Sequence, residues 1–285
     1  MIDSATRSGA EAPALRRHRT SRAGPRKARG AGSALRSGLL FVALVQAGCA
    51  DDAVTRLDYE LRRTLPHDPD AYTQGLLIDG GTFYESTGQY GESELRQVDI
   101  ATGSVLRSHA LSEEYFGEGL ALVGDKLIQL TWKAGLAFVY DAATLVQEKT
   151  FEYDGEGWGI CYDGEWLFMS DGTGDLFRRD PETFDLVDRI RVTRDGFSTR
   201  NLNELECVGD QIYANIYQSD EIVRIDKATG EITGTLDAYS LTLASRRPQD
   251  AGAVLNGIAF DASTGVFYVT GKLWPTMFEV AITEE

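Results

Sequence analysis

Cysteine and histidine are both scarce in this chain of 285 residues, which contains three of each. Three cysteines are too few for the disulfide framework of a small secreted domain. One histidine lies in the basic N-terminal tail, so only His67 and His109 remain, and a metal site built from several histidines is nearly excluded. We expect both to lie away from the functional residues, which leaves no convincing histidine for a Ser-His-Asp triad.

Basic residues are outnumbered: 28 Lys and Arg stand against 44 Asp and Glu, giving a net charge of -16. Such a surface repels phosphate backbones and excludes nucleic-acid binding. No GxxxxGK[ST] or helix-opening GxGxxG motif is present, so no phosphate-binding loop is expected. Proline is also rare, at 7, whereas glycine reaches 30 and aromatic residues 10%, a balance that favours short strands and tight turns.

Long apolar runs are absent as well. The run GLLFVALV at residues 38–45 is too short to span a bilayer as a helix. It follows a basic segment and precedes Ala47-Gly48-Cys49, an order typical of a secretory signal that resembles a lipobox. We therefore predict that residues 1–49 are a leader. The protein would be exported, either as a periplasmic or outer-membrane lipoprotein attached to the membrane through Cys49, or as a secreted protein.

What the remaining sequence does have is an internal repeat. The pattern D-x-x-T occurs five times, beginning at Asp99, Asp141, Asp180, Asp226 and Asp261. Asp and Thr side chains close turns on the backbone, and segments of alternating polarity flank these turns, as in hairpins. A second hairpin is interleaved with each copy. Two hairpins per period of ~40 residues make four strands, which is the blade of a β-propeller.

We therefore predict an all-β fold for residues 50–285: a single five-bladed β-propeller with four antiparallel strands per blade. A solenoid fits the repeats equally, but a closed ring needs no capping units and none is visible. Residues Leu57–Leu65 are expected to be the outer strand that completes the last blade, and Asp237–Val254 a long surface loop. Cys161 and Cys207 fall in neighbouring blades at different strand offsets, so we expect two buried free thiols.

One position of the repeat differs in every copy, although scaffold positions should look alike. It lies just before the innermost strand of each unit and is occupied by Gln74, Glu118, Trp158, Asn203 and Asn256. Five equivalent positions around the axis should form a ring at one mouth of the channel. The ends of the paired strands, which carry Glu85, Trp132, Tyr217 and Lys272, should return to that mouth. A concave site with convergent polar groups is predicted there.

Each of these residues also has a purely structural interpretation. Asn and Gln at a strand start can cap backbone groups, and Trp132 and Trp158 can belong to the core. Glu118 is harder to explain in this way, because it lies between two glycines and follows Phe116. Glycines permit close approach of the backbone, and a carboxyl group beside aromatic rings tends to have a raised pKa.

Several blocks of the sequence resemble the plant-type glutaminyl-peptide cyclotransferases, which have bacterial relatives. The resemblance covers about residues 57–282, and the blocks are Ala71-Tyr-Thr-Gln-Gly-Leu76, Tyr84-Glu-Ser-Thr-Gly88, Tyr115-Phe-Gly-Glu-Gly-Leu120, Gly157-Trp-Gly159, Leu202-Asn-Glu-Leu-Glu206, Ala214-Asn-Ile-Tyr217 and Val269-Thr-Gly-Lys-Leu-Trp-Pro275. The family implies a five-bladed propeller without cofactor or metal. It also implies cyclisation of the N-terminal glutamine of peptides or proteins to pyroglutamate, with release of ammonia.

By motif, the catalytic acid/base of that family falls on Glu118. Its substrate pocket carries over to Gln74, Phe116, Trp132, Trp158, Asn203 and Lys272, to which the sequence adds Tyr72, Glu85 and Tyr217. Tyr72 and Tyr217 stand where papaya-type sequences have Phe and Trp, so they concern substrate preference more than the reaction. A bacterial, monomeric member of the family is expected.

Two other functions fit the same residues. Glu118, Asn203 and Asn256, with a further carboxylate around one axis, could hold Ca²⁺ in a propeller lactonase or hydrolase. A non-catalytic lipoprotein that binds a ligand is the other, since propellers are common binding platforms and fold does not fix function.

Overall fold

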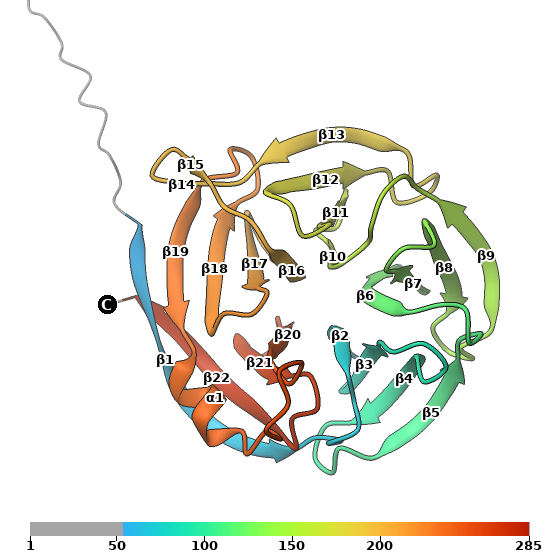
Figure 1. Cartoon of the computed structure of the whole chain (residues 1–285), viewed down its shortest axis with the longest axis horizontal. Coiled ribbons are helices and arrows are strands. Elements are labelled where there is room, and N and C mark those ends of the chain that lie inside the picture. The colour runs from blue at the N-terminus through green and yellow to red at the C-terminus, as the bar shows by residue number, and fades with distance from the viewer. Residues whose placement is uncertain (1–53, 285) are drawn as a thin grey trace, which may run out of the picture. The chain divides into compact units, whose positions relative to one another are not determined.

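The computed structural model describes residues 54–284, and nearly all of the regular structure there is β-strand. The strands form three four-stranded sheets, one eight-stranded sheet and one two-stranded hairpin. Figure 1 shows the larger sheets arranged around a common centre. The predicted all-β class is therefore confirmed, whereas the predicted leader and Cys49 lie outside the described residues.

Each four-stranded sheet is an antiparallel meander, and its first strand lies nearest the centre (Figure 1). The first sheet contains β2 (Thr73–Asp79), β3 (Thr82–Thr87), β4 (Glu94–Asp99) and β5 (Val105–Ala110). The second contains β6 (Gly117–Val123), β7 (Lys126–Thr131), β8 (Leu136–Asp141) and β9 (Gln147–Glu152). The third contains β10 (Ile160–Tyr162), β11 (Leu167–Met169), β12 (Asp175–Arg179) and β13 (Leu186–Arg191). The small hairpin that follows consists of β14 (Thr193–Arg194) and β15 (Phe197–Ser198).

The eight-stranded sheet joins two such units through the N-terminal strand β1 (Thr55–Pro66). One unit contains β16 (Leu202–Val208), β17 (Gln211–Ile216), β18 (Glu221–Asp226) and β19 (Ile232–Asp237). The other contains β20 (Leu255–Asp261), β21 (Val266–Gly271) and β22 (Thr276–Glu284). Strand β1 pairs antiparallel with β22 and parallel with β19. The predicted pairing of Leu57–Leu65 with the last unit is thus confirmed.

The repeated Asp-x-x-Thr turns form as the sequence predicts. At Asp99 and Asp141, for example, the Oδ1 atom accepts hydrogen bonds from both the backbone N–H and the hydroxyl of the threonine three residues later. The next residue has a positive φ, which glycine adopts without strain in three of the copies. The other two copies place Leu145 and Phe184 there, and both side chains are buried.

The hydrophobic core lies between neighbouring sheets rather than in one central mass. Leu77 and Leu95 of the first sheet, for instance, pack in one cluster with Leu120, Leu127 and Phe138 of the second. Each interface buries one face of both sheets and so removes their apolar side chains from water. Because the apolar side chains lie between the sheets, the polar ends of the innermost strands lie at the centre of the molecule.

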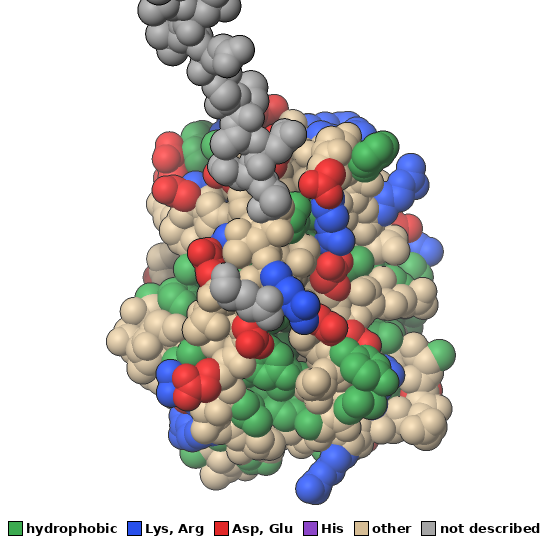
Figure 2. Space-filling model, turned by 90° about the vertical axis from the view of Figure 1, so that its left-hand side faces the viewer, with side chains coloured by type: hydrophobic (Ala, Val, Ile, Leu, Met, Phe, Trp, Pro, Cys, Tyr) green, Lys and Arg blue, Asp and Glu red, His purple; other side chains and the backbone are tan. Residues whose placement is uncertain are grey.

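The segment Asp237–Val254 is not simply a surface loop. It contains the helix α1 (Tyr239–Ala244), whose Leu241 and Thr242 are buried. Leu241 packs against the core of the eight-stranded sheet, which explains why this insertion is ordered. No helix within residues 54–284 is long and apolar enough to cross a membrane. On the face drawn in Figure 2, acidic and basic side chains are interspersed, as on an ordinary solvated surface.

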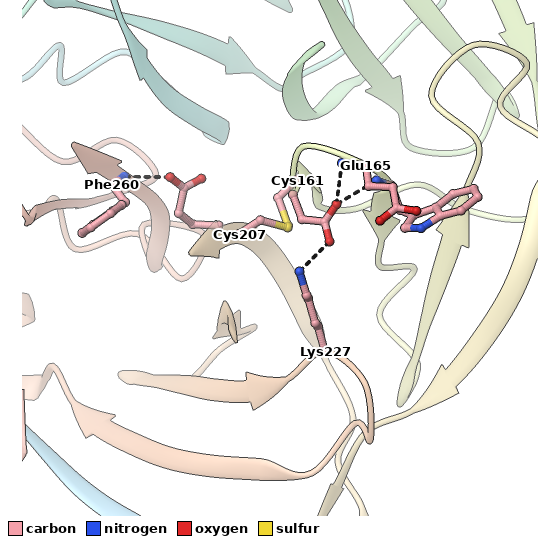
Figure 3. Close-up of a disulfide and its surroundings, with 8 residues drawn as sticks. Cys161, Glu165, Cys207, Lys227 and Phe260 are labelled. Carbon is pink, nitrogen blue, oxygen red and sulfur yellow. Dashed lines mark hydrogen bonds and ion pairs between the residues drawn. A yellow bond between two sulfur atoms is a disulfide. The ribbon is translucent and has the colours of Figure 1, made fainter. Parts of the chain in front are cut away.

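Cys161 and Cys207 form a disulfide, with Cα atoms 5.5 Å apart (Figure 3), so the prediction of two free thiols is wrong. The prediction relied on a difference of one residue in strand offset between β10 and β16. Strand β16 has a β-bulge between Leu202 and Leu205, whereas β10 pairs in regular register. The extra residue absorbs the offset and brings the two cysteines side by side.

Replacing both cysteines by alanine is expected to lower the free energy of unfolding by about 2–4 kcal/mol, because the bridge restricts the unfolded chain. The sequence separation of 46 residues places this loop in the range where that effect is substantial. Denaturant unfolding of the double variant and of the reduced wild type should give the same loss. An unchanged unfolding midpoint in both would contradict a stabilising bridge.

Candidate active site

The innermost strands begin around a pocket with a volume of about 180 Å³. Its lining residues are Tyr72, Gln74, Gln89, Phe116, Glu118, Trp132, Trp158, Asn203, Tyr217 and Lys272. Nine of the ten site residues predicted from the sequence are among them, and the exception is Glu85. Their placement agrees with the sequence, while their chemical roles remain predictions.

β-Bulges explain how the ring positions reach the pocket. Four of the five innermost strands have a register irregularity close to their first residue. These irregularities span residues 73–75, 117–120, 202–205 and 255–258, and contain Gln74, Glu118, Asn203 and Asn256. A bulge inserts a residue without a ladder partner and re-aims its side chain. In four of the five units, the variable position of the repeat is therefore the residue that the bulge turns toward the centre.

Glycines allow the innermost strands to approach closely at the same level. A Cβ atom on Gly159 would lie 2.0 Å from the carbonyl oxygen of Asn203, and one on Gly119 would lie 2.7 Å from that of Trp158. The Gly119 N–H instead donates a 2.7 Å hydrogen bond to the Trp158 carbonyl. This close contact fixes Glu118 relative to Trp158, although they belong to different sheets.

Glu118 is the central polar group of the pocket and is only 4% exposed. Its Oε1 atom accepts a hydrogen bond of 3.0 Å from Nε2 of Gln74. The Gln74 amide is oriented in turn by Asn256, whose Nδ2 lies 3.4 Å from the Gln74 Oε1. Burial raises the pKa of Glu118 well above its usual range; Lys272 opposes that rise, and Glu156 adds to it. A buried carboxyl group with this shift is a candidate acid/base.

Lys272 supplies the positive group of the pocket, and its side chain is 3% exposed. Its Nζ atom lies 4.8 Å from the centre of the Tyr72 ring and 5.2 Å from that of Tyr217, so both rings face a cation. Burial lowers the pKa of Lys272 to about 8, against the opposing effect of Glu118. Tyr72 and Tyr217 thus form part of the aromatic wall of the pocket and also contact the ammonium group of Lys272.

The other aromatic residues meet edge to face around the opening. Phe116 has its ring centre 5.5 Å from that of Trp132 and 6.1 Å from that of Tyr72. Trp158 lies 5.5 Å from Tyr217 in the same T-shaped manner. Such contacts fix ring orientations and surround the Glu118 carboxyl group with apolar surface.

Glu85 does not line the pocket, which corrects its predicted place there. Its carboxylate accepts hydrogen bonds from His67 Nε2 at 2.9 Å and Thr73 Oγ1 at 2.7 Å, and from Arg96 Nε and Nη2 at 3.0 and 2.9 Å. The strand end does return toward the centre, but Glu85 lies opposite Arg96 as a cross-strand pair between β3 and β4. His67, which the sequence suggested was uninvolved, is 6% exposed and anchors this network.

Burial by itself would raise the pKa of Glu85, yet Arg96 and His67 overcome it and hold that pKa well below the usual carboxyl range. Glu85 is therefore an ionised structural group. It supports the site indirectly, because its partner Thr73 precedes Gln74 in the bulge of β2. The cross-strand Glu-Arg pair was the signal in the sequence that could have revealed this role.

Two residues near the pocket were missed. Gln89 lines it from the turn after β3 with φ of 103°, a conformation rare for a residue with a side chain, and no repeat position marks it. Glu156 lies just outside the lining and accepts hydrogen bonds from two pocket tryptophans. Its place between glycines, in Gly155-Glu156-Gly157, parallels that of Glu118 and could have drawn attention to it.

A cluster of three or more His, Cys, Asp or Glu side chains able to hold a metal ion does not occur within residues 54–284. Asp171, which follows β11, is half-buried and closes a turn by accepting the Thr173 N–H at 2.9 Å. The pocket instead places one carboxyl group and one lysine together. A neighbouring cation weakens the binding of Ca²⁺, so the donor set does not favour the calcium-dependent alternative.

The fold and the pocket together define an all-β protein whose pocket holds one buried carboxyl group, enclosed by aromatic walls where the sheets converge. Comparison with known proteins identifies a family for this chain. The family model described as glutamine cyclotransferase matches residues 35–282. A glutaminyl-peptide cyclotransferase of Arabidopsis thaliana is 41% identical over 230 residues, covering 80% of this chain and 72% of that protein. The chain belongs to the glutamine cyclotransferase family.

A solved structure extends the comparison to three dimensions. The crystal structure of the Myxococcus xanthus glutaminyl cyclase superimposes with a TM-score of 0.77 at 40% sequence identity. The match covers 81% of this chain and 99% of that one. The likeness therefore extends over most of this chain and nearly all of the other.

Proposed function

We propose that this protein cyclises the N-terminal glutamine of peptides or proteins to pyroglutamate and releases ammonia, with Glu118 as acid and base. The observation that carries the proposal is the buried Glu118 carboxyl group with its raised pKa, held by Gln74 in an aromatic pocket. The named relatives support it, since both are glutaminyl cyclising enzymes by description.

The reaction needs one group that can take up a proton and return it. The α-amine attacks the side-chain carbonyl carbon, a C–N bond forms, and a tetrahedral oxyanion results. Glu118 accepts the proton that the attacking nitrogen must lose and delivers it to the departing amide nitrogen. The second C–N bond then breaks, ammonia leaves and Glu118 returns to its first state. A carboxyl group with a raised pKa suits both steps near neutral pH.

Three donors could stabilise the oxyanion. Gln74, Asn203 and Lys272 line the pocket with Glu118, and each side chain carries N–H groups. Donors fixed in advance at the site of developing charge act strongly where water is excluded. Because the attack is intramolecular, holding the amine and the amide in a folded geometry supplies much of the acceleration.

The size of the pocket agrees with a substrate recognised by one residue. Its volume of about 180 Å³ lies below the roughly 300–1,000 Å³ of pockets that hold drug-sized ligands. A single terminal side chain with its amine fits such a space, and the rest of a peptide must remain outside. The hydroxyl groups of Tyr72 and Tyr217, where papaya-type sequences have Phe and Trp, bear on the choice of substrate.

The finer architecture that we infer is a five-bladed β-propeller. The three four-stranded sheets supply three blades, and the two halves of the eight-stranded sheet supply the fourth and fifth. The parallel contact between β19 and β1 would then join neighbouring blades, while β1 and β22 close the ring. Export by the leader, with or without lipid on Cys49, remains part of the proposal.

The proposal is tested by incubating the purified protein with a glutamine-initiated peptide. We expect ammonia release together with the matching loss of mass, in the presence or absence of a chelator. The same peptide with an acetylated amine should not react, because it lacks the nucleophile. A folded protein that binds the peptide without releasing ammonia would favour a binding module, and turnover lost to chelator would favour a metal-dependent hydrolase.

The pH dependence of kcat/KM should show whether the charge of Lys272 contributes to the reaction. Its pKa of about 8 means that its charge disappears as the pH rises through that value. If the charge stabilises the oxyanion, kcat/KM should decline above about pH 8 in the wild type. Lys272→Arg keeps the charge, so its alkaline decline should lie at higher pH, even if its maximum is lower. The substrate amine titrates identically with both enzymes, and coincident alkaline limbs would exclude this role.

A further inference from the structure

Glu156 joins two walls of the pocket without lining it. It lies between β9 and β10, and its side chain is 40% exposed. One carboxylate oxygen, Oε2, accepts a hydrogen bond of 2.7 Å from Nε1 of Trp132 and another of 3.1 Å from Nε1 of Trp158. Trp132 follows β7 and Trp158 precedes β10, so the carboxylate links side chains from two neighbouring sheets.

The backbone around both tryptophans is already fixed. The Trp132 N–H donates to the Phe116 carbonyl at 3.0 Å, and the Gly157 N–H donates to the Trp132 carbonyl at 3.0 Å. The remaining freedom is rotation of the indole rings about their side-chain bonds. Hydrogen bonds to a charged acceptor are stronger than neutral ones and directional, so a shared carboxylate can restrict both rings at once.

Lys133 completes the outer side of this arrangement. Its Nζ atom lies 3.7 Å from the centre of the Trp132 ring and 3.9 Å from Oε1 of Glu156. Trp132 is thus held by Glu156 at its N–H, by Lys133 on its face and by an edge-to-face contact with Phe116. Trp158 has room for its ring because residue 172 is glycine, where a Cβ atom would lie 2.5 Å from the indole.

We propose that Glu156 is a positioning residue that sets the orientation of Trp132 and Trp158, and through them the shape of the substrate pocket. The consequence for catalysis rests on the proposed function. Rings that rotate away would admit water and loosen the folded geometry of the glutamine side chain. A misplacement of about 1 Å can reduce the rate ~100-fold in such a reaction.

The test compares Glu156→Gln with Glu156→Leu. Glutamine keeps a carbonyl oxygen that can accept both indole N–H groups, whereas leucine keeps approximate size and accepts neither. We expect kcat/KM to fall about 10–100-fold in the leucine variant and only a few-fold in the glutamine variant. Glu152→Leu, at an exposed position at the end of β9, is the matched control and should leave kcat/KM unchanged.

Indole N–H resonances provide a readout independent of turnover. The chain has 4 tryptophans, and the resonances of Trp132 and Trp158 can be assigned by replacing each with phenylalanine. In Glu156→Leu both should shift upfield while those of Trp166 and Trp274 stay in place, with the melting temperature little changed. Unmoved Trp132 and Trp158 resonances would overturn the proposal even if the wild type had no cyclase activity.

The charge of Glu156 allows a second test, which separates an electrostatic effect on Glu118 from positioning of the indole rings. The charged side chains that influence the Glu118 pKa are Lys272, which lowers it, and Glu156, which raises it, beside the larger effect of burial. If Glu156 acted only through charge, the glutamine variant would lose as much activity as the leucine variant. That result, with indole resonances in their native positions in Glu156→Gln, would also overturn a positioning role.

Discussion

Replacing Glu118 by glutamine is expected to lower kcat by about 10²–10⁴-fold, the usual contribution of a positioned acid/base group. Glutamine has nearly the same shape and can still accept the Gln74 N–H, but it cannot take up the proton from the attacking amine. Binding should change little, because the aromatic walls and Lys272 are left in place. Steady-state kinetics of ammonia release, with KM determined separately, is the measurement.

A half-buried glutamate outside the pocket supplies the control for that experiment. Glu206 on β16 also has a raised pKa, about 8, caused by burial, but it does not line the pocket and accepts the Phe260 N–H at 2.8 Å. Glu206→Gln should therefore keep kcat within a few-fold of the wild type. Equal losses in the two variants would show that the Glu118 effect reflects general damage, and full activity of Glu118→Gln would refute its catalytic role.

Arg96→Leu is expected to lower the free energy of unfolding by about 3–5 kcal/mol, the usual cost of leaving one partner of a buried ion pair without the other. Arg96 donates to Glu85 through Nε and Nη2, and its Nη1 donates to Asp68 at 2.8 Å. Without Arg96, the 1% exposed Glu85 would retain only His67 as a charged partner. Chemical denaturation at neutral pH measures the loss.

The double replacement of Arg96 and Glu85 by leucine should regain much of that stability, because the buried carboxylate is removed together with its arginine, and His67, which then lacks the carboxylate that raises its pKa, can be neutral. The direction in which this stability changes with pH also follows from the shift of the Glu85 pKa. The Glu85 pKa is lowered by folding, so its contribution is complete above the ordinary carboxyl range and is lost only as the pH falls through the lowered value. A loss below about 1 kcal/mol for Arg96→Leu would mean that the pair is a surface-type interaction.

The network also connects stability to the pocket. Thr73 donates its hydroxyl to Glu85, and its carbonyl accepts from Nδ2 of Asn256 at 3.0 Å. Gln74, which holds Glu118, is the next residue along the bulge. Arg96→Leu should therefore reduce kcat/KM as well, through the position of Gln74 rather than through contact with the substrate.

The sequence by itself determined the all-β class, the repeat and most of the pocket. Turn residues such as Asp99 and Thr102 form hydrogen bonds with each other across only three positions of the chain, so the local sequence suffices to predict the turn. The ring position could be found because the repeat compares its own copies: Gln74, Glu118 and Asn203 vary where a scaffold would not. The bulges that release these residues occur at equivalent places, which is why equivalence in sequence became proximity in space.

Only the tertiary structure decided contacts that cross between sheets or depend on which face a side chain takes. Glu85 occupies the predicted strand end but pairs with Arg96 and His67. The alternation of residues along one strand does not show whether such a side chain faces the pocket or a partner on a neighbouring strand. The Cys161–Cys207 disulfide depends on a bulge in one strand and its absence in the other. The role proposed for Glu156 depends on two indole N–H groups that reach one carboxylate only after their sheets pack. Such long-range geometry is set by the packing of whole sheets and not by neighbours in sequence.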